Sequence, residues 1–287
     1  MAMTYNGSNG DTRTAMENTL KKSGLTIEEI NMAYKELMQG LTSVDPKVIL
    51  NIANSIWYRE DFYVLPDFLQ INTDYFESEV NALDFSNPAS IDIINDWVSQ
   101  KTNNKIETII DQIPSEAVMY LINAIYFNGI WKYEFKKEDT HLQEFFPEGV
   151  ASYQTPMMHL TDSVNFFSND LFSSIELPYG NGHYSMFFYL PKSGKTVDDV
   201  VSSLSPETWS DWLNSYTKEK VSVSIPKFKF EFEDTLNNEL TSMGMGIAFT
   251  GQADFSKINP EYDLYISMVK QKAYVDVNEK ALRLPPV

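Results

Sequence analysis

The sequence predicts an α+β fold, because its first forty residues have the apolar spacing of helices and most segments after residue 117 have the composition of strands. The chain has 287 residues, of which 43% are hydrophobic, so it is long enough to bury a sizeable core. No internal repeat, low-complexity segment or linker interrupts it. We therefore expect a single domain over residues 1–287.

Four helices are expected before residue 103. The first begins at Asp11 or Thr12, either of which can cap it, and runs to Lys22. Thr26 caps the second, whose acidic first turn suits the positive end of the helix dipole. The other two are expected over Pro66–Phe76 and Ile91–Thr102.

Strands are expected to dominate the rest of the chain. The run Val118–Phe127 is apolar except for Asn123, and such a composition is typical of a strand that is buried on both faces. The other expected strands are Val48–Tyr58, Val164–Phe167, Ser173–Leu177, Ser185–Leu190, Val221–Ile225, Phe228–Phe232 and Leu264–Asn278. Three further helices are expected over Val197–Leu204, Pro206–Tyr216 and Asp234–Met243.

The charge and composition exclude several classes of function. With 40 acidic against 22 basic residues, the formal net charge is −18, which argues against nucleic acid or an anionic membrane as a partner. The chain has no cysteine, so disulfides and thiolate chemistry are excluded. No apolar run is long enough to span a bilayer, and the first residues do not resemble a signal peptide, so localisation is left open.

No pattern in the sequence indicates an active site. The three histidines, His141, His159 and His183, do not lie at a spacing typical of metal ligands. There is no G-x-S-x-G motif and no phosphate-binding loop. Adjacent carboxylates such as Asp198 and Asp199 lie at helix starts, where the helix dipole explains them. We therefore expect no catalytic residue, metal or cofactor.

Several segments, in order and with fitting spacing, resemble the serpin family of serine protease inhibitors. The most specific is Asn123-Ala-Ile-Tyr-Phe-Asn-Gly-Ile-Trp131, which resembles the signature N-A-x-Y-F-x-G-x-W of a strand in the main sheet of that family. The other matching segments are Met3–Thr12, Asn51–Trp57, Thr155–Met158, Pro226–Phe228, Ala253–Ser256 and Lys272–Glu279. Together they cover nearly the whole chain.

This resemblance implies a serpin fold of three β-sheets surrounded by about nine helices, truncated here at both ends. It also implies a mechanism in which a protease cleaves an exposed loop, and the cut loop enters the main sheet as a new strand. The partner of a complete protein would be a serine protease, with cysteine proteases as a second class. Such proteins are often extracellular, although no signal peptide is present in this chain.

Five residues match positions that serve this mechanism. Asn123 matches the polar residue of the "shutter", where the sheet parts, and Gln271 takes the place of its usual histidine partner. An Asn123–Gln271 amide pair would satisfy both side chains; alternatively, Gln271 lies exposed on a strand edge. Lys227 and Glu279 match an ion pair at the "breach", where insertion begins, and Trp131 matches the tryptophan beside it, or packs in an ordinary core.

The C-terminal tail departs from the family. After Glu279 the family continues with a hinge of the type Gly-Thr-Glu-Ala-Ala-Ala-Gly, whereas residues 280–287 read Lys-Ala-Leu-Arg-Leu-Pro-Pro-Val. Two prolines cannot donate hydrogen bonds in a central strand, so this tail could not insert. One choice of codons for the tail encodes that hinge when a base is added and the frame is shifted, which suggests a frameshift. An unrelated tail is the alternative.

The sequence therefore predicts a serpin-family inhibitor that is inactive as this chain, because the reactive-centre loop and its reactive bond are missing. Self-association is expected, since the closing strands of the family are absent as well. The alternatives are a non-inhibitory serpin-fold protein, acting as a binding or chaperone-like module, and a pseudogene product. The composition of the hinge would discriminate between them.

Overall fold

A computed structural model describes residues 1–280, so Ala281–Val287, nearly all of the departing tail, lies outside the described residues. Contacts divide the chain into two compact units, which are described one at a time. Unit 1 comprises Met1–Ser43, Leu50–Tyr126 and Glu231–Tyr274. Unit 2 comprises Val44–Ile49, Phe127–Phe230 and the chain from Val275 onward. Strands β1, β3, β9 and β10 each contribute residues to both units.

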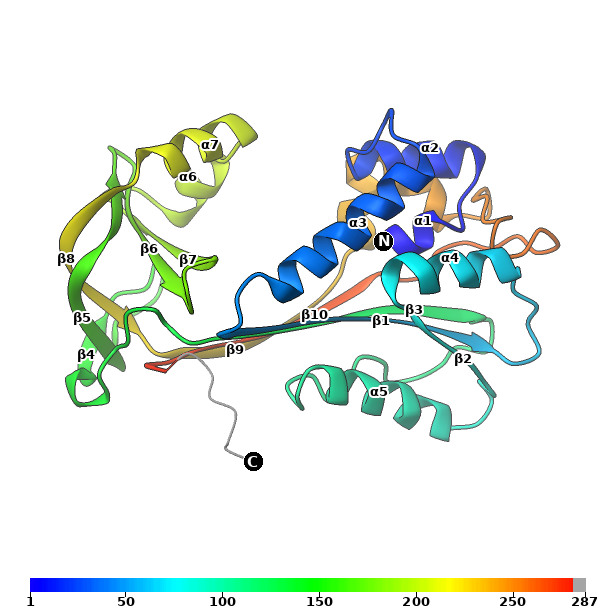
Figure 1. The fold of residues 1–287 in the computed structure, drawn as a ribbon, viewed down its shortest axis with the longest axis horizontal. Helices are drawn as coiled ribbons and strands as arrows, with labels where there is room; N and C mark the ends of the chain where they lie inside the picture. Colours follow the sequence, from blue (N-terminus) through cyan, green and yellow to red (C-terminus); the bar gives the residue numbers. More distant parts are fainter. Residues whose placement is uncertain (281–287) are drawn as a thin grey trace. The chain divides into compact units, whose positions relative to one another are not determined.

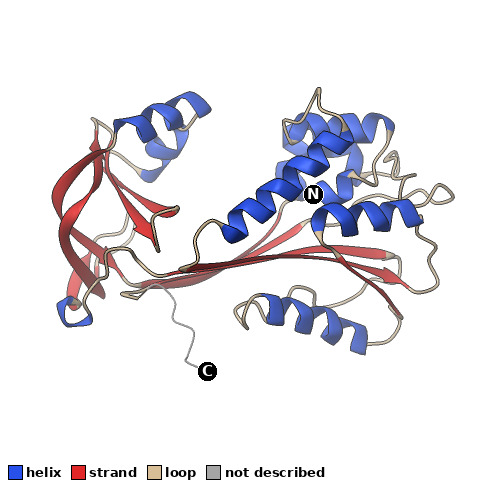
Figure 2. Cartoon of the chain, viewed as in Figure 1, coloured by secondary structure: helices blue, strands red, loops and turns tan. Residues whose placement is uncertain are grey.

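The helices of unit 1 follow the predicted order (Figures 1 and 2). They are α1 (Ala2–Tyr5), α2 (Gly10–Thr19), α3 (Ile27–Ser43), α4 (Pro66–Phe76), α5 (Ala89–Lys101), α8 (Asn237–Leu240), η2 (Thr241–Met245) and η3 (Gly246–Phe249). The start of α3 is confirmed. The Thr26 N–H donates to Glu29 Oε2 at 2.8 Å, and the Glu29 N–H donates to Thr26 Oγ1 at 3.2 Å, which is a capping box.

Two predicted helix starts were wrong. Helix α2 begins at Gly10, before the predicted cap, because the buried Thr12 side chain accepts a hydrogen bond from the Asp254 N–H instead of capping the helix. The predicted helix Asp234–Met243 begins only at Asn237, because strand β9 continues to Thr235. Both errors arise from partners that lie far away in the sequence.

Unit 1 contains most of two small sheets. Strands β1 (Val48–Arg59), β2 (Glu79–Leu83) and β3 (Met119–Gly129) form a three-stranded sheet in the order β2-β1-β3. Strand β2 is parallel to β1, with Ser55 opposite Glu79. Strands β9 (Phe228–Thr235) and β10 (Lys270–Val277) form a two-stranded sheet. Strand β10 starts six residues later than predicted, because Leu264 and Ile266 bond to loop and helix carbonyls.

Strand β3 corrects the prediction of a strand buried on both faces. Its residues alternate, so that Ile122, Ala124 and Tyr126 are buried, whereas Asn123 and Ile125 are exposed. One face is covered by α5, whose Ile94, Trp97 and Val98 pack against Trp57, Ile122 and Ala124. On the other face, Met119 and Leu121 are partly buried against the core around Ile56 and Phe68, but Asn123 and Ile125 are exposed, so from Ile122 to Tyr126 the pattern has a period of two.

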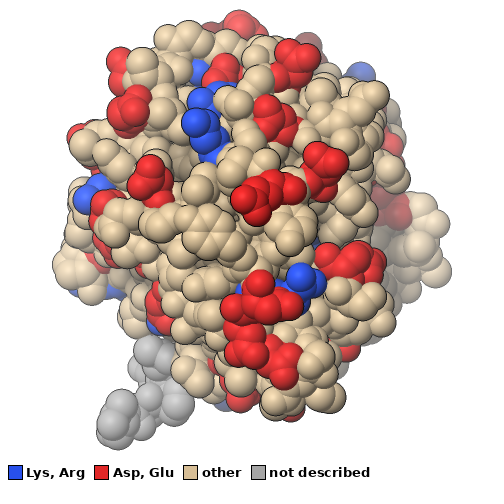
Figure 3. All heavy atoms as spheres, turned by 90° about the vertical axis from the view of Figure 1, so that its right-hand side faces the viewer, with Lys and Arg blue, Asp and Glu red and all other residues tan. Residues whose placement is uncertain are grey.

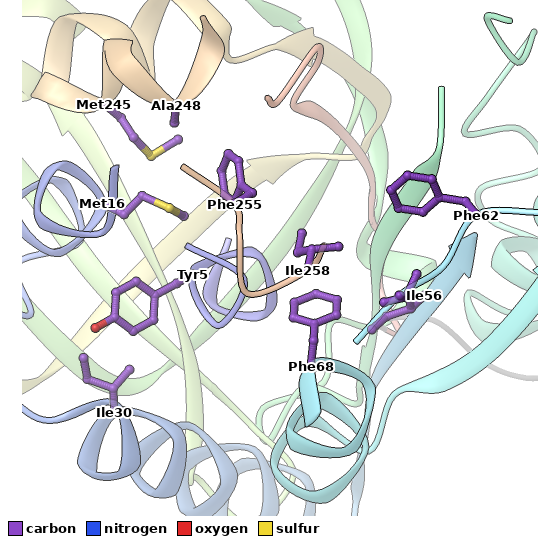
Figure 4. Close-up of a cluster of buried hydrophobic side chains, with 11 residues drawn as sticks. Tyr5, Met16, Ile30, Ile56, Phe62, Phe68, Met245, Ala248, Phe255 and Ile258 are labelled. Atoms are coloured by element: carbon purple, nitrogen blue, oxygen red, sulfur yellow. The ribbon is translucent and has the colours of Figure 1, made fainter. Parts of the chain in front are cut away.

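The main core of unit 1 lies on the opposite side of β1 from α5 (Figures 1 and 4). Ile56 of β1 packs with Phe68 of α4, whereas the adjacent Trp57 faces α5. The other members of this core are Tyr5, Met16, Ile30, Phe62, Val64, Met245, Ala248, Phe255 and Ile258. A Cβ at Gly7 would lie 2.4 Å from Ile258 Cγ1, so only glycine fits between α1 and this core.

Unit 2 contains a five-stranded sheet built around one long strand. Strands β4 (His141–Phe145), β5 (Tyr153–Ser168), β6 (Phe172–Tyr179) and β7 (Tyr184–Pro191) lie in this order, and β8 (Thr217–Pro226) pairs with β5. Strand β5 starts well before the predicted Val164, because it also pairs with β4 and β8. It contacts β8 over ten register pairs, from Met157–Pro226 to Phe166–Thr217.

Two helices and a short 3-10 turn complete unit 2. They are η1 (Lys137–Asp139), α6 (Val197–Ser202) and α7 (Pro206–Ser215). Thr196 caps α6 and Ser205 caps α7, each through a capping box. The rings of Phe172 in β6 and Trp212 in α7 pack edge to face, with 4.7 Å between their centroids, so α7 packs on β6.

The acidic charge is concentrated in unit 1, which has 24 Asp and Glu against 10 Lys and Arg, compared with 16 against 12 in unit 2. On the face shown in Figure 3, acidic side chains clearly outnumber basic ones. Within residues 1–280, no helix is long and apolar enough to cross a membrane.

Candidate functional site

Lys227 and Glu279 lie together in unit 2, as expected from the sequence. Lys227 Nζ lies 2.8 Å from Glu279 Oε2, and the Lys227 N–H donates to the Pro156 carbonyl at 2.9 Å, which holds the backbone between β8 and β9. The other carboxylate oxygen, Oε1, accepts a hydrogen bond from the Thr140 hydroxyl at 2.9 Å. Both oxygens of a residue that is only 7% exposed therefore have donors.

The surroundings of Glu279 favour its ionised form. Burial raises the pKa of this carboxyl, but hydrogen bonds from Lys227, from its own N–H and from Thr140 outweigh burial, so the pKa lies below the ordinary value. Because the Lys227 side chain is 36% exposed, solvent screens part of the attraction. Glu279 is therefore held as a carboxylate at the end of β10.

Trp131 fixes the residue before Glu279. Its ring is 3% exposed and stacks on Tyr179 with 4.3 Å between centroids and 15° between planes. The indole N–H donates to the Asn278 carbonyl at 2.9 Å. Gly129 allows this packing, since a Cβ there would lie 2.7 Å from Tyr179 Cδ1. Core packing and contact with the end of β10 therefore occur together, and the two predicted roles of Trp131 do not exclude each other.

Asn123 belongs to a chain of amide hydrogen bonds in unit 1. Its Nδ2 donates to Asn54 Oδ1 at 2.9 Å, and Asn54 Nδ2 in turn donates to the Phe76 carbonyl at 2.7 Å. Asn54 is 5% exposed, so its two hydrogen bonds satisfy a buried amide. The chain links β3, β1 and the end of α4.

Gln271 corrects the expected amide pair. Its side chain is exposed on β10, and among the described residues no hydrogen bond joins it to Asn123. The exposed position on the strand, which was the alternative expected from the sequence, is the one that Gln271 occupies, and only Val277 is buried on β10. Asn123 finds its partner on β1 instead, which is the neighbouring strand in its own sheet.

Three contributors to these sites were not predicted: Thr140, Asn278 and Asn54. For Asn54 the sequence contained a signal, because it is a polar residue within the largely apolar run that forms β1. Thr140 and Asn278 had no such signal, since Thr140 follows a short turn and Asn278 acts through its backbone carbonyl. Their roles depend on contacts between distant segments.

The arrangement can hold strand ends but offers no constellation for catalysis. Within the described residues, no group of three or more His, Asp or Glu side chains is placed to hold a metal ion. His141 and His159, which are far apart in the sequence, stack with their rings 5.5 Å apart, and His159 Nδ1 lies 2.9 Å from Ser224 Oγ. Two imidazoles and one hydroxyl are fewer ligands than a structural zinc site needs.

Comparison with known proteins agrees with the resemblance seen in the sequence. The family model for serpins (serine protease inhibitors) matches residues 1–283. An uncharacterized serpin-like protein of Methanosarcina acetivorans is 34% identical over 286 residues, covering 98% of this chain and 66% of that protein. Iripin-8 of Ixodes ricinus is 32% identical, covering 98% of this chain and 71% of its own length. The chain thus spans about two thirds of these relatives.

Solved structures share the fold. The thermophilic serpin tengpin in its native state matches 100% of this chain and 74% of its own chain, with a TM-score of 0.89 and 33% identity. Human thyroxine-binding globulin also matches 100% of this chain and 78% of its own, with a TM-score of 0.89 and 25% identity. The α+β fold with its helices and three sheets is therefore that of the serpins, and the chain belongs to the serpin family.

Proposed function

We propose that a complete protein containing this chain inhibits serine proteases, with cysteine proteases as a second target class. The chain belongs to a family of inhibitors and binding proteins, not of enzymes. In the family mechanism the cleaved loop enters the main sheet as a strand and carries the protease with it. We assign the breach to Trp131, Lys227 and Glu279, and the shutter to Asn123 and Gln271, with Asn54 as the partner of Asn123.

The Lys227–Glu279 ion pair at 2.8 Å is the observation that best supports this proposal. It lies directly after β10, where the family continues into the hinge of the loop, and Trp131 binds the adjacent backbone. A carboxylate with both oxygens bonded holds the end of the strand in one place. Insertion can then start only where this contact is broken.

A gel assay tests the proposal. The complete protein, with its loop and closing strands, is incubated with trypsin, chymotrypsin and subtilisin, and we expect an SDS-stable complex with at least one of them. Cleavage of the loop without any complex would show that the protein is a substrate and not an inhibitor. In the same protein Glu279→Lys places like charges together, so native gels after heating should show more loop-sheet polymer than for wild type.

The 287-residue chain by itself should behave differently. We expect no complex with any of the three proteases, because residues 280–287 do not resemble the hinge of an inhibitory serpin. We also expect oligomeric elution and binding of a hydrophobic dye, since Phe187, Phe188 and Tyr189 are only half-buried. A covalent complex formed by this chain would contradict the assignment of its tail.

The second candidate is a non-inhibitory binding protein of serpin fold. The match to human thyroxine-binding globulin over 100% of this chain favours it, because that structure is complexed with a small ligand. The same gel assay separates the two candidates, since a binder yields no SDS-stable complex with any protease.

A further inference from the structure

Two histidines from neighbouring strands of unit 2 lie side by side. His141 is the first residue of β4 and lies opposite Met157 of β5, and His159 lies two residues further along β5. The two rings stack with 5.5 Å between their centroids and 26° between their planes. The spacing of these histidines in the sequence gives no sign of a metal site, because only the pairing of β4 with β5 brings them together.

The ring of His159 is oriented by a hydroxyl on the strand at its other side. His159 lies opposite Ser224 of β8, and its Nδ1 lies 2.9 Å from Ser224 Oγ. When Nδ1 donates its proton to that hydroxyl, the lone pair of the ring is on Nε2, which is the form that binds metal ions. Metal-binding histidines are commonly oriented in this way, by a partner of the ring nitrogen that does not bind the metal.

The other ring nitrogen of His159 has no partner within residues 1–280. Nε2 is buried, yet no donor or acceptor of the described chain reaches it. A polar atom in this state is unfavourable, so it points to a ligand that these residues do not supply. The neighbouring His141 is exposed, so its ring can change rotamer while the His159 ring stays in place.

The separation of the two rings suits a shared ion. A bond between a metal ion and a histidine nitrogen is about 2.0–2.1 Å long, so two imidazoles on one tetrahedral ion have centroids roughly 5 Å apart. The observed separation of 5.5 Å is close to that value. Because the rings are stacked, they are not yet directed at a common point, and binding requires the exposed His141 ring to rotate.

The donor set selects the class of ion. Imidazole nitrogens suit Cu²⁺, Ni²⁺ and Zn²⁺, whereas Mg²⁺ and Ca²⁺ prefer oxygen ligands. Within the described residues no group of three or more His, Asp or Glu side chains is placed to hold a metal ion, so water must fill the other positions of an ion bound here. The net charge of −18 attracts cations of every kind, so it does not contribute to this selection.

We propose that His141 and His159 form an open site for a divalent transition metal ion, with Ser224 as the residue that orients His159. The inference goes beyond the proposed function, because neither protease inhibition nor the binding of a small ligand requires a metal ion. An ion held by both rings joins β4 to β5 one residue after Thr140, the residue whose hydroxyl donates to Glu279. Metal binding should therefore stabilise the start of β4.

Three variants and one matched control test the site. His141→Gln removes an exposed imidazole, so it keeps the test valid even if a change at His159 impairs folding. His159→Asn keeps a polar atom near the position of Nδ1 and removes Nε2, and Ser224→Ala removes only the orienting hydroxyl. The control is His183→Gln, because His183 is the third histidine of the chain and lies exposed in the turn between β6 and β7.

The first measurement is calorimetric titration of the tag-free 287-residue chain with CuCl₂. We expect a single Cu²⁺ ion per chain, which is lost in His141→Gln and in His159→Asn and is retained in His183→Gln. Ser224→Ala should bind Cu²⁺ about tenfold more weakly, and unchanged affinity would overturn its orienting role. The site is overturned if wild type binds no Cu²⁺, if binding survives the loss of either proposed ligand, or if His183→Gln or an excess of Mg²⁺ abolishes it.

The second measurement identifies the bound atoms and the effect on stability. The electron paramagnetic resonance spectrum of bound Cu²⁺ should show coupling to imidazole nitrogen, and Zn²⁺ should raise the Tm of wild type but not that of His141→Gln. A spectrum without nitrogen coupling would show that carboxylates hold the ion, and an equal rise of Tm in both proteins would place it elsewhere. Either result overturns the site and leaves the proposed function intact, because the protease gel assay is run without added metal.

Discussion

The cluster that we assign to the breach, in unit 2, and the cluster that we assign to the shutter, in unit 1, are both polar sites at strand positions, but they are built differently. In the breach, the buried carboxylate of Glu279 accepts hydrogen bonds from the Lys227 ammonium and the Thr140 hydroxyl. Trp131, which stacks on Tyr179, lies beside it. In the shutter, two amides and a carbonyl form a chain without any charge. The first site depends on charge and aromatic packing, whereas the second depends on hydrogen-bond geometry alone.

The two expected pairs of side chains also differ in where the structure places them. Lys227 and Glu279 were named as a pair because both match the ion pair of the family, and Lys227 Nζ does lie 2.8 Å from Glu279 Oε2. An amide can be satisfied by many groups, including the neighbouring Asn54 of β1, which Asn123 uses in place of Gln271. The match to the family therefore identified the partner of Glu279, whereas the amide of Asn123 found a different partner within its own sheet.

The largest effect should come from the aromatic part of the breach. Trp131→Ala removes the stack on Tyr179 and the bond to Asn278, and should lower the free energy of unfolding by about 3–5 kcal/mol. Urea unfolding followed by circular dichroism measures it. Trp209→Ala, at a 38% exposed position of the same unit, is the control and should cost far less. Equal losses would show that the stack adds nothing specific.

The central amide of the shutter should rank second. Asn54→Leu leaves the Phe76 carbonyl and the Asn123 amide without their partner, so we expect a loss of about 1–3 kcal/mol in the same urea assay. Asn123→Ala should cost less, because Asn123 is exposed and water can replace it. A larger loss for Asn123→Ala than for Asn54→Leu would contradict the buried amide as the centre of this site.

Breaking the ion pair of the breach should have a smaller effect. Lys227→Met leaves Glu279 with only Thr140 and its own N–H as donors, and should destabilise the chain by about 1 kcal/mol, because the lysine is partly screened. Lys220→Met, an exposed lysine of β8, is the matched control. If both variants unfold at the same urea concentration as wild type, the ion pair does not contribute measurably to the free energy of unfolding.

The smallest expected effect is a difference between the two sites in how their contribution to stability depends on pH. The pKa of Glu279 is lowered in the folded chain, so its stabilising effect is complete above the ordinary value of 4.5 and is lost as the pH falls through the folded value. The stability difference between wild type and Glu279→Gln should therefore shrink as the pH is lowered below 4.5. The effect of Asn54→Leu should not change over that range, since no group of the shutter chain titrates. A pH-independent Glu279→Gln effect would argue against a charged breach.

Local signals explain how much of the fold could be predicted. Pro66 at a helix start and the Thr26–Glu29 capping box depend on residues within one turn, and both helices were predicted correctly. The burial of β3 depends on what covers each of its faces, which a composition of apolar residues does not reveal. Likewise, the start of α2 depends on a bond between Thr12 and the distant Asp254.

The same contrast between local signals and contacts of distant segments applies to the candidate site. Lys227, Glu279 and Trp131 could be named because their segments resemble motifs of a family. The resemblance also predicted that Lys227 and Glu279 form an ion pair, and the two side chains do so. The supporting groups could not be named, since the Asn278 carbonyl and the Thr140 hydroxyl come from segments that are 138 residues apart in the numbering. Sequence patterns identify side chains by type, and they do not identify backbone atoms brought together by folding.

The pairing of strand β5 limits where the coding sequence can lose or gain codons. The strand pairs with β4 through residues 153–157, with β8 through residues 157–166 and with β6 through residues 165–168, so after deletion of one codon between residues 158 and 164 its two halves could no longer keep both registers, and the side chains on one side of the deletion would turn to the wrong face. The turn of residues 23–26 between α2 and α3 has no such constraint, because its residues are exposed and a Cβ on Gly24 would meet no other atom within 4 Å. Length variation during evolution should therefore accumulate in such turns and leave the length of β5 constant.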